Sequence, residues 1–131
     1  MRRFDVRTSE REQMVDVTER VAQEVRADGV AEGWALVYVP HTTAGVTVNE
    51  NADPSVTRDL LDGLRRLVPR EGGWHHVEGN ADGHVKASLV GSSVTVPVSG
   101  GGLALGTWQG VYLCEFDGPR RRQVFVQTLG K

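Results

Sequence analysis

The helical and strand patterns of this chain are separated along the sequence, and this separation is the strongest constraint on its fold. Apolar residues recur at helical spacing in three stretches, all of them before residue 91. The rest of the chain alternates short apolar stretches with glycine-containing turns, as strands do. The pattern favours an α+β fold with an antiparallel β-sheet or sandwich over a fold in which strands and helices alternate. We expect one domain over 1–131, because no linker or repeat divides the 131 residues.

The first helix is predicted over about 11–27. Ser9, followed three residues later by Glu12, has the form of a capping box. Valines then recur at helical spacing, and Gly29 is the kind of residue that commonly closes a helix.

The second helix is predicted to begin at Asp53-Pro54, an acidic N-cap followed by a proline in the first turn, and to end before Pro69. The third is predicted over about 81–90, with Asn80 as its N-cap. Its predicted apolar ridge consists of Val85 and Leu89. The predicted strands cover 2–8, 33–40, 43–49, 94–98, 103–107, 109–116 and 123–129.

Composition narrows the class of protein. The formal net charge of −2 disfavours nucleic acid or an anionic membrane as the main partner. Cys114 is the only cysteine, so no intrachain disulfide can form, and we expect a cytoplasmic protein. No apolar run approaches the roughly 18 residues that cross a membrane. No glycine-rich dinucleotide or phosphate loop is present, so we expect no nucleotide cofactor.

The most unusual stretch, residues 41–53, gathers polar side chains around an apolar stripe. His41 begins it, and Asn49 and Glu50 lie at the end of its predicted strand. Burying an unpaired polar group costs about 1–3 kcal/mol, so these side chains either face water or line a polar site. Solvent exposure, with Asp53 capping a helix, is the alternative.

Residues 75–86 hold a second set of candidate site residues. His76 and His84 lie eight residues apart, a spacing that is a weak metal signal by itself. Surface or capping histidines are the alternative. The other polar side chains of this stretch are Glu78, Asn80, Asp82 and Lys86.

Residues 105–122 form the third unusual stretch. Gln109 and Glu115 are predicted on one face of a strand, and the arginines at 120–122 either grip an anion or form a solvated turn. The side chains of the opposite face, which we expect in the core, are Trp108, Tyr112, Cys114 and Phe116.

These three stretches, in this order, resemble the YjbQ-like family, whose members are often called secondary thiamine-phosphate synthase enzymes. The resemblance covers nearly the whole chain. Gly83 departs from the alanine or serine that is more common in the family at this point. The matching segments are HTTAGVTVNENADP (41–54), HVEGNADGHVKASLVGSSVTVPV (76–98) and LGTWQGVYLCEFDGPRRR (105–122).

The resemblance implies a β-rich α+β fold, a homotrimer and a polar pocket at or near subunit contacts. It also implies a divalent, zinc-like metal on His41, His76 and His84. Three neutral imidazoles, with open positions for water or substrate, are typical of a catalytic zinc site.

The remaining candidates would act on or contact a small-molecule substrate around that metal. Glu50, Asp82 and Lys86 are the candidate catalytic residues, with Glu50 or Asp82 as the base. Lys86 and Arg120 are candidates to hold a phosphate. Further residues expected to contact substrate or cofactor are Asn49, Asn80 and Gln109.

Three functions stay open from the sequence. The family's usual name implies an enzyme that joins a phosphoryl-bearing thiazole to a pyrimidine pyrophosphate, which gives thiamine phosphate. A metal-dependent hydrolase or lyase acting on a small phosphorylated metabolite is the second. The third is a trimeric module that binds a metabolite without catalysis.

Overall fold

The computed structural model describes residues 1–131 and confirms an α+β fold with three helices. Strands predominate after residue 91, as the sequence predicts. The elements in chain order are β1 (Arg2–Arg7), β2 (Gln13–Asp16), α1 (Thr18–Asp28), β3 (Gly33–Tyr38), β4 (Ala44–Glu50), α2 (Pro54–Leu67), α3 (Ala81–Val90), β5 (Ser93–Ser99), β6 (Gly102–Leu103), β7 (Gln109–Glu115) and β8 (Arg121–Gly130).

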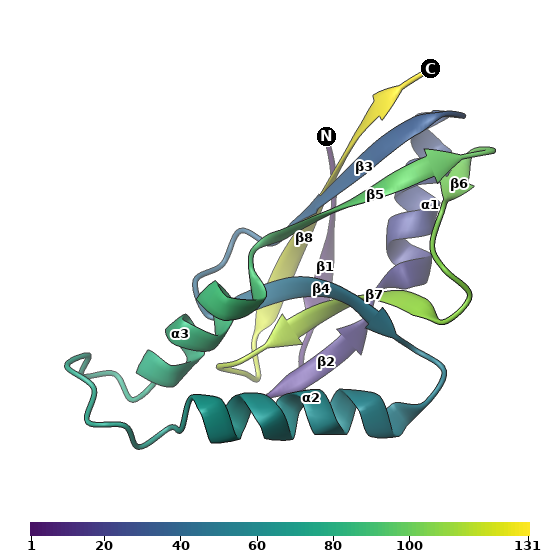
Figure 1. The fold of residues 1–131 in the computed structure, drawn as a ribbon. Coiled ribbons are helices and arrows are strands. Elements are labelled where there is room, and N and C mark those ends of the chain that lie inside the picture. Colours follow the sequence, from purple (N-terminus) through teal and green to yellow (C-terminus); the bar gives the residue numbers. More distant parts are fainter.

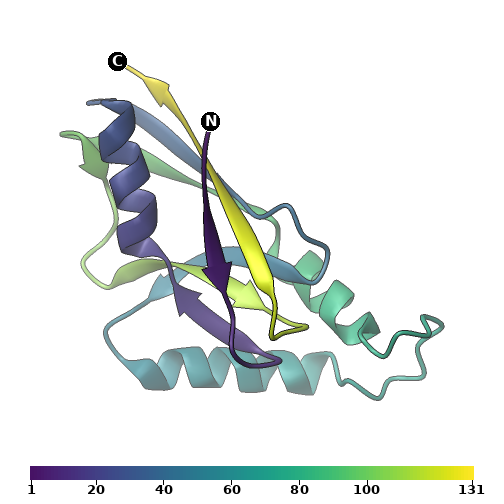
Figure 2. The same ribbon diagram turned by 180° about the vertical axis from the view of Figure 1, so that it is seen from behind.

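The strands form two antiparallel sheets, which are seen from opposite sides in Figures 1 and 2. The larger sheet has the order β1-β8-β3-β5-β6, and the smaller has the order β2-β7-β4. In both views α2 runs along the side of the smaller sheet that faces away from the larger one, and α3 lies beside one end of that sheet. No helix in the structure is long and apolar enough to cross a membrane.

The main core lies between the two sheets and includes the inner face of α1. It is built mostly of valine, whose branched side chain packs well on a pleated surface. Val37 of β3, Val46 of β4, Val111 of β7 and Val124 of β8 are all fully buried there.

A second, smaller core lies on the other face of the smaller sheet, under α2 and α3. Tyr112, Cys114 and Phe116 are buried there, as predicted. Trp108 is not, since 63% of it is exposed in the turn before β7. The strand β7 is therefore covered on both faces. Burial raises the pKa of the Cys114 thiol to about 12, which keeps this thiol protonated and inert near neutral pH.

The predicted start of the first helix is wrong. Residues 13–16 form β2, which pairs with β7, and α1 begins only at Thr18. No capping box forms, because the Ser9 amide donates to Gln13 Oε1 and the Glu12 carboxylate pairs with Lys86. The helix ends as predicted, with Gly29 at a left-handed φ of 73°.

The other two helices have the predicted bounds. Asp53 caps α2 by accepting a hydrogen bond of 2.9 Å from the Ser55 amide. The predicted ridge of α3 is wrong, because Val85 and Leu89 are exposed by 36% and 61%, whereas the polar side of α3 faces inward. Gly83 lies on that inner side, where a Cβ would come within 2.9 Å of the Phe116 carbonyl oxygen.

Candidate functional site

Two open hollows meet at His41 and His84, and they bring together segments that are far apart in the sequence. His41 lies between β3 and β4, and His84 lies in the first turns of α3. Both histidines, together with Thr42, line both hollows.

One hollow, which we call the neutral hollow, has a volume of about 500 Å³. Its other lining residues come from the start of β4, the second half of α3 and the link from α3 to β5, and are Ala44, Ala87, Ser88, Gly91 and Ser92. The second, which we call the charged hollow, has a volume of about 340 Å³. Its other lining residues are Pro40, Thr43, Glu78, Asn80, Asp117, Arg120 and Arg122.

His41 is held by the edge of the larger sheet. The pairing of β3 with β8 ends at Tyr38 and Phe125, and the amide of Gln123 then donates to Nε2 of His41 at 2.8 Å. The imidazole thus continues the hydrogen bonding of β8 where β3 turns away. Burial and the nearby Arg122 guanidinium lower the pKa of His41, so the ring is neutral.

His84 contacts His76, which itself lines neither hollow. Their rings are 5.2 Å apart between centroids and nearly perpendicular, at 87°. His76 belongs to the segment between α2 and α3, and its Nε2 lies 3.8 Å from Glu78 Oε2. His75, which precedes it, is exposed and lines neither hollow. The structure therefore brings His41, His76 and His84 into one region.

The donor chemistry of His41 does not fit a three-imidazole metal site. A neutral imidazole has one lone pair available as an acceptor, and the Gln123 amide already uses the lone pair on Nε2. The other nitrogen, Nδ1, then carries the proton. Three histidine, cysteine or carboxylate side chains are not grouped as metal ligands anywhere in the chain.

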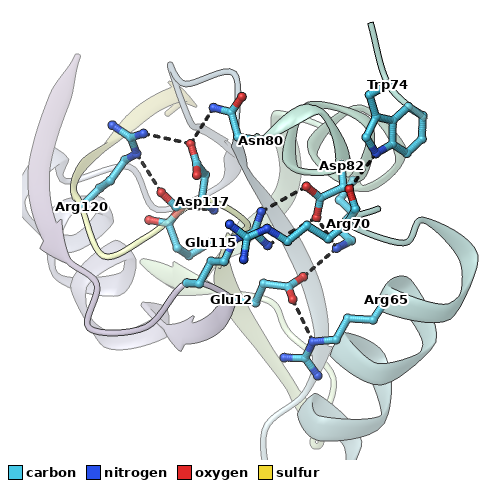
Figure 3. A network of polar contacts seen from close by, with 11 residues as sticks. Glu12, Arg65, Arg70, Trp74, Asn80, Asp82, Glu115, Asp117 and Arg120 are labelled. Atoms are coloured by element: carbon cyan, nitrogen blue, oxygen red, sulfur yellow. Dashed lines mark hydrogen bonds and ion pairs between the residues drawn. The ribbon is translucent and has the colours of Figure 1, made fainter. Parts of the chain in front are cut away.

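The charged hollow is organised around Asp117. Asn80 Nδ2 donates to Asp117 Oδ2 at 2.8 Å, and Arg120 Nη2 donates to the same oxygen at 2.9 Å (Figure 3). Burial opposes ionisation of Asp117, but these two donors outweigh it and lower the pKa of the carboxyl group. Asn80 occupies the N-cap position of α3 without a capping hydrogen bond from its side chain, and its Oδ1 is buried without a partner.

Asp82 and Lys86 lie outside both hollows. Lys86 Nζ is 2.9 Å from Asp82 Oδ2 and 2.8 Å from Glu12 Oε2, and the lysine side chain is only 1% exposed. Two arginines extend this network, with Arg11 on Asp82 and Arg65 on Glu12. Figure 3 shows the pair formed by Arg65 and Glu12. The charges of this network therefore join α3 to the segment around β2 and to α2.

Glu50, Asn49 and Gln109 lie at the opposite end of β4 from His41. That strand covers Ala44–Glu50, about 20 Å at roughly 3.3 Å per residue. The three side chains line a separate hollow of about 310 Å³, together with Val48 and the exposed Trp108. Within one chain, this group and the histidines form two distinct sites.

Sequence reasoning missed a buried ion pair behind the histidines. Arg122 pairs with Glu115, and Thr8 Oγ1 donates to Glu115 Oε1 at 2.8 Å. The same guanidinium donates to Thr43 Oγ1 at 2.9 Å, which fixes the segment that carries His41. Only the tertiary fold reveals this pair. By contrast, Ser88 lines the neutral hollow one helical turn after His84, so its position could have been predicted from helical spacing.

These features define a two-sheet α+β domain with a polar, histidine-lined site at one end of the smaller sheet. Residues 2–131 match the sequence profile of the family described as UPF0047 protein YjbQ-like, and the chain belongs to this family. It is 47% identical over 128 residues to a UPF0047 protein of Methanocaldococcus jannaschii, covering 98% of this chain and 93% of that protein. It is 45% identical over 131 residues to YugU of Bacillus subtilis, covering 99% of each.

Solved structures share the fold closely. A YjbQ/UPF0047 family protein of Clostridium acetobutylicum superposes with a TM-score of 0.97 at 50% identity, over 98% of this chain and 100% of that one. A protein of Sulfolobus solfataricus, described as YbjQ-like and of unknown function, gives a TM-score of 0.95 at 33% identity, over 99% and 96% of the two chains. The comparisons thus establish the family, without the thiamine-phosphate synthase activity that the family's usual name implies.

Proposed function

We propose that this protein is a small-molecule enzyme whose site is the pair of hollows on either side of His41 and His84. The observation that carries the proposal is the convergence of separate segments, around 41, 80–92 and 117–122, on these two imidazoles. His84 is the proposed proton carrier, because its imidazole forms no hydrogen bond within the chain and borders both hollows.

The two hollows differ in chemistry, which supports a substrate with two unlike ends. Hydroxyls and small apolar groups line the neutral hollow, whereas two carboxylates and two guanidinium groups line the charged one. Their volumes of about 500 and 340 Å³ lie in the range of small-molecule sites. A metabolite with an uncharged ring at one end and a charged group at the other would place the bond between them near His84.

The joining of a thiazole phosphate to a pyrimidine pyrophosphate is the narrower form of this proposal. It would release thiamine phosphate and pyrophosphate. Departure of pyrophosphate is helped by cations. The cations of the charged hollow, Arg120 and Arg122, are both paired with carboxylates, and Lys86 lies outside the site. The narrower reaction therefore rests on the resemblance alone.

The proposal is tested by comparing His84→Ala with His75→Ala, a neighbouring histidine outside both hollows. With both thiamine precursors as substrates, we expect His84→Ala to lower turnover by about 100-fold or more, the usual contribution of a positioned acid or base. His75→Ala is expected to keep turnover near the wild-type value. Equal turnover by all three proteins would place the activity elsewhere.

A wild-type protein that turns over neither precursor would overturn the narrower proposal. The broader one is then checked by NMR with each precursor. Shifts of the His84 ring resonances without turnover would favour a metabolite-binding module over an enzyme. No shift at saturating precursor would remove this class of metabolite from consideration.

We also propose a homotrimer, as the resemblance implies, with the outer face of the larger sheet in the subunit contact. Trp34, Tyr38 and Leu129 are exposed there by 38%, 41% and 61%. Trp34 and Leu129 are direct cross-strand partners, so these two exposed apolar groups are adjacent, and Tyr38 pairs with Phe125 further along the same strands. Such a surface is more typical of an interface than of a free face.

Trp34→Glu is therefore expected to convert the trimer to monomer, measured by light scattering after size exclusion. The matched control is Leu67→Glu on α2, where the side chain is 76% exposed, and this variant should stay trimeric. A monomeric wild-type protein, or a Trp34→Glu variant that remains trimeric, would contradict the proposed contact.

A further inference from the structure

We infer that His41 donates a hydrogen bond from Nδ1 to an oxyanion of the ligand, either phosphate or carboxylate. We also infer that His41 is not a metal ligand. The inference deepens the proposed function and rests on it for the location of the ligand. It arises from the way the sheet holds the ring and from what remains free on the ring.

The sheet selects one tautomer of His41. The Gln123 amide points its N–H at Nε2 from 2.8 Å, so Nε2 must be the unprotonated nitrogen. A proton on Nε2, whether in the other tautomer or in the imidazolium, would face this N–H and break the bond. The amide belongs to β8 at the point where β3 no longer covers it, so the imidazole is its acceptor.

The other ring nitrogen is free to act on a ligand. Nδ1 carries the proton and makes no hydrogen bond within the chain. Asn80 Oδ1 is the only buried side-chain nitrogen or oxygen without a hydrogen-bond partner. Because Nδ1 of His41 also lacks a partner but is not such a buried atom, it is accessible from outside. Because His41 lines both hollows, this N–H is offered to whatever occupies them.

The hydrogen-bond donors around His41 favour an oxyanion as its acceptor. Arg120 and Arg122 both line the charged hollow. Each is paired with a carboxylate, Asp117 or Glu115, but its Nη1 makes no hydrogen bond within the chain and can still donate to a ligand. The positive end of α3, a helix of ten residues, opens at Asn80 on the same hollow. Of the two carboxylates that line this hollow, Asp117 is held by Asn80 and Arg120, and Glu78 lies 3.8 Å from Nε2 of His76.

A metal on His41 would require a different arrangement. Coordination through Nε2 would break the bond from Gln123, and coordination through Nδ1 would require an imidazolate while Nε2 still accepts that bond. A divalent cation added to the protein is therefore expected to leave His41 unchanged.

The first test is the tautomer, read from long-range proton–nitrogen NMR spectra of the full-length protein. We expect an unprotonated Nε2 and a protonated Nδ1 for His41, with both signals unchanged on addition of zinc ions. A protonated Nε2, or a zinc-induced shift that His41→Gln abolishes, would overturn the inference. Neither measurement requires turnover, so the proposed function can fail while this assignment stands.

The second test uses inorganic phosphate and acetate as probes, and two variants. We expect at least one probe to shift the Nδ1 signal of His41, and the two arms distinguish phosphate from carboxylate recognition. His41→Gln, whose amide oxygen can replace Nε2 as acceptor for Gln123, should keep the unfolding midpoint and bind the active probe about tenfold or more weakly. His41→Ala should have both a lower unfolding midpoint and weaker probe binding. The oxyanion assignment would be overturned if neither probe shifted the Nδ1 signal, or if His41→Gln bound the active probe as tightly as the wild type.

Discussion

Lys86→Met is expected to lower the free energy of unfolding by about 3 kcal/mol. Methionine nearly matches the length of the lysine side chain, so the main loss is the buried ammonium rather than packing volume. Asp82 is fully buried, and both it and Glu12 would lose their shared cation, retaining only Arg11 and Arg65. The measurement is urea unfolding at pH 7.

An exposed ion pair provides the matched control for Lys86→Met. Arg26 and Glu19 pair on the surface of α1, with side chains exposed by 54% and 74%. Arg26→Met should therefore change the unfolding free energy by about 0.5 kcal/mol or less. A loss below about 1 kcal/mol for Lys86→Met would show that the buried network is dispensable.

The pH dependence of the unfolding free energy is also expected to differ between Lys86→Met and the wild type. Burial opposes ionisation of Asp82 and Glu12, but the hydrogen bonds from Lys86 and the arginines outweigh it and lower the pKa of each carboxyl. A lowered folded-state pKa adds stability above the unfolded-state pKa, and this stability is lost as pH falls through the folded-state value. Between pH 7 and acid, Lys86→Met should therefore lose less stability than the wild type.

This network also explains why the orientation of α3 escaped sequence reasoning. Val85 and Leu89 have the spacing of a buried ridge, yet they are exposed, while Asp82 and Lys86 at i and i+4 are buried. Buried charges need partners, and Glu12 lies 74 residues away in the chain. A local pattern cannot show that such a distant partner exists, so hydrophobicity alone assigned the wrong face.

The predicted start of α1 was wrong for the same reason. Glu12 has the position of a capping-box residue, but its carboxylate pairs with the buried Lys86, which needs a partner of opposite charge. The strand β2 then follows because Met14 pairs opposite Cys114 and packs on the second core. By contrast, Asp53-Pro54 and Gly29 act through bonds within a few residues, and both were predictable.

For the candidate site, the sequence supplied the residues but could not supply their grouping. His41, His84, Asn80 and Arg120 do share the charged hollow. Glu50, Asn49 and Gln109 lie with Trp108 at the far end of β4, because a strand carries its two ends apart. The tautomer of His41 depends on the Gln123 amide, which no side-chain motif encodes.

Arg122→Met is the second substitution with a large expected effect, about 4 kcal/mol of unfolding free energy. Glu115 is fully buried, and Arg122 is its only cationic partner, so the variant leaves a carboxylate in the interior with the Thr8 hydroxyl and the Asp117 amide as donors. The measurement is again urea unfolding at pH 7. A loss of less than about 1 kcal/mol would mean that the pair is not a stabilising contact.

The double variant Arg122→Met with Glu115→Leu separates the burial of charge from the loss of contacts. Replacing both partners by apolar groups removes the unpaired carboxylate, so we expect the double variant to be more stable than Arg122→Met alone. Its His41 signals should still differ from the wild type, because the bond from Arg122 to Thr43 that fixes this segment is absent in both variants. A free-energy loss in the double variant equal to the sum of the losses in the two single variants would instead show that Arg122 and Glu115 act independently. Unchanged His41 signals in the double variant would show that the Gln123 amide alone holds His41.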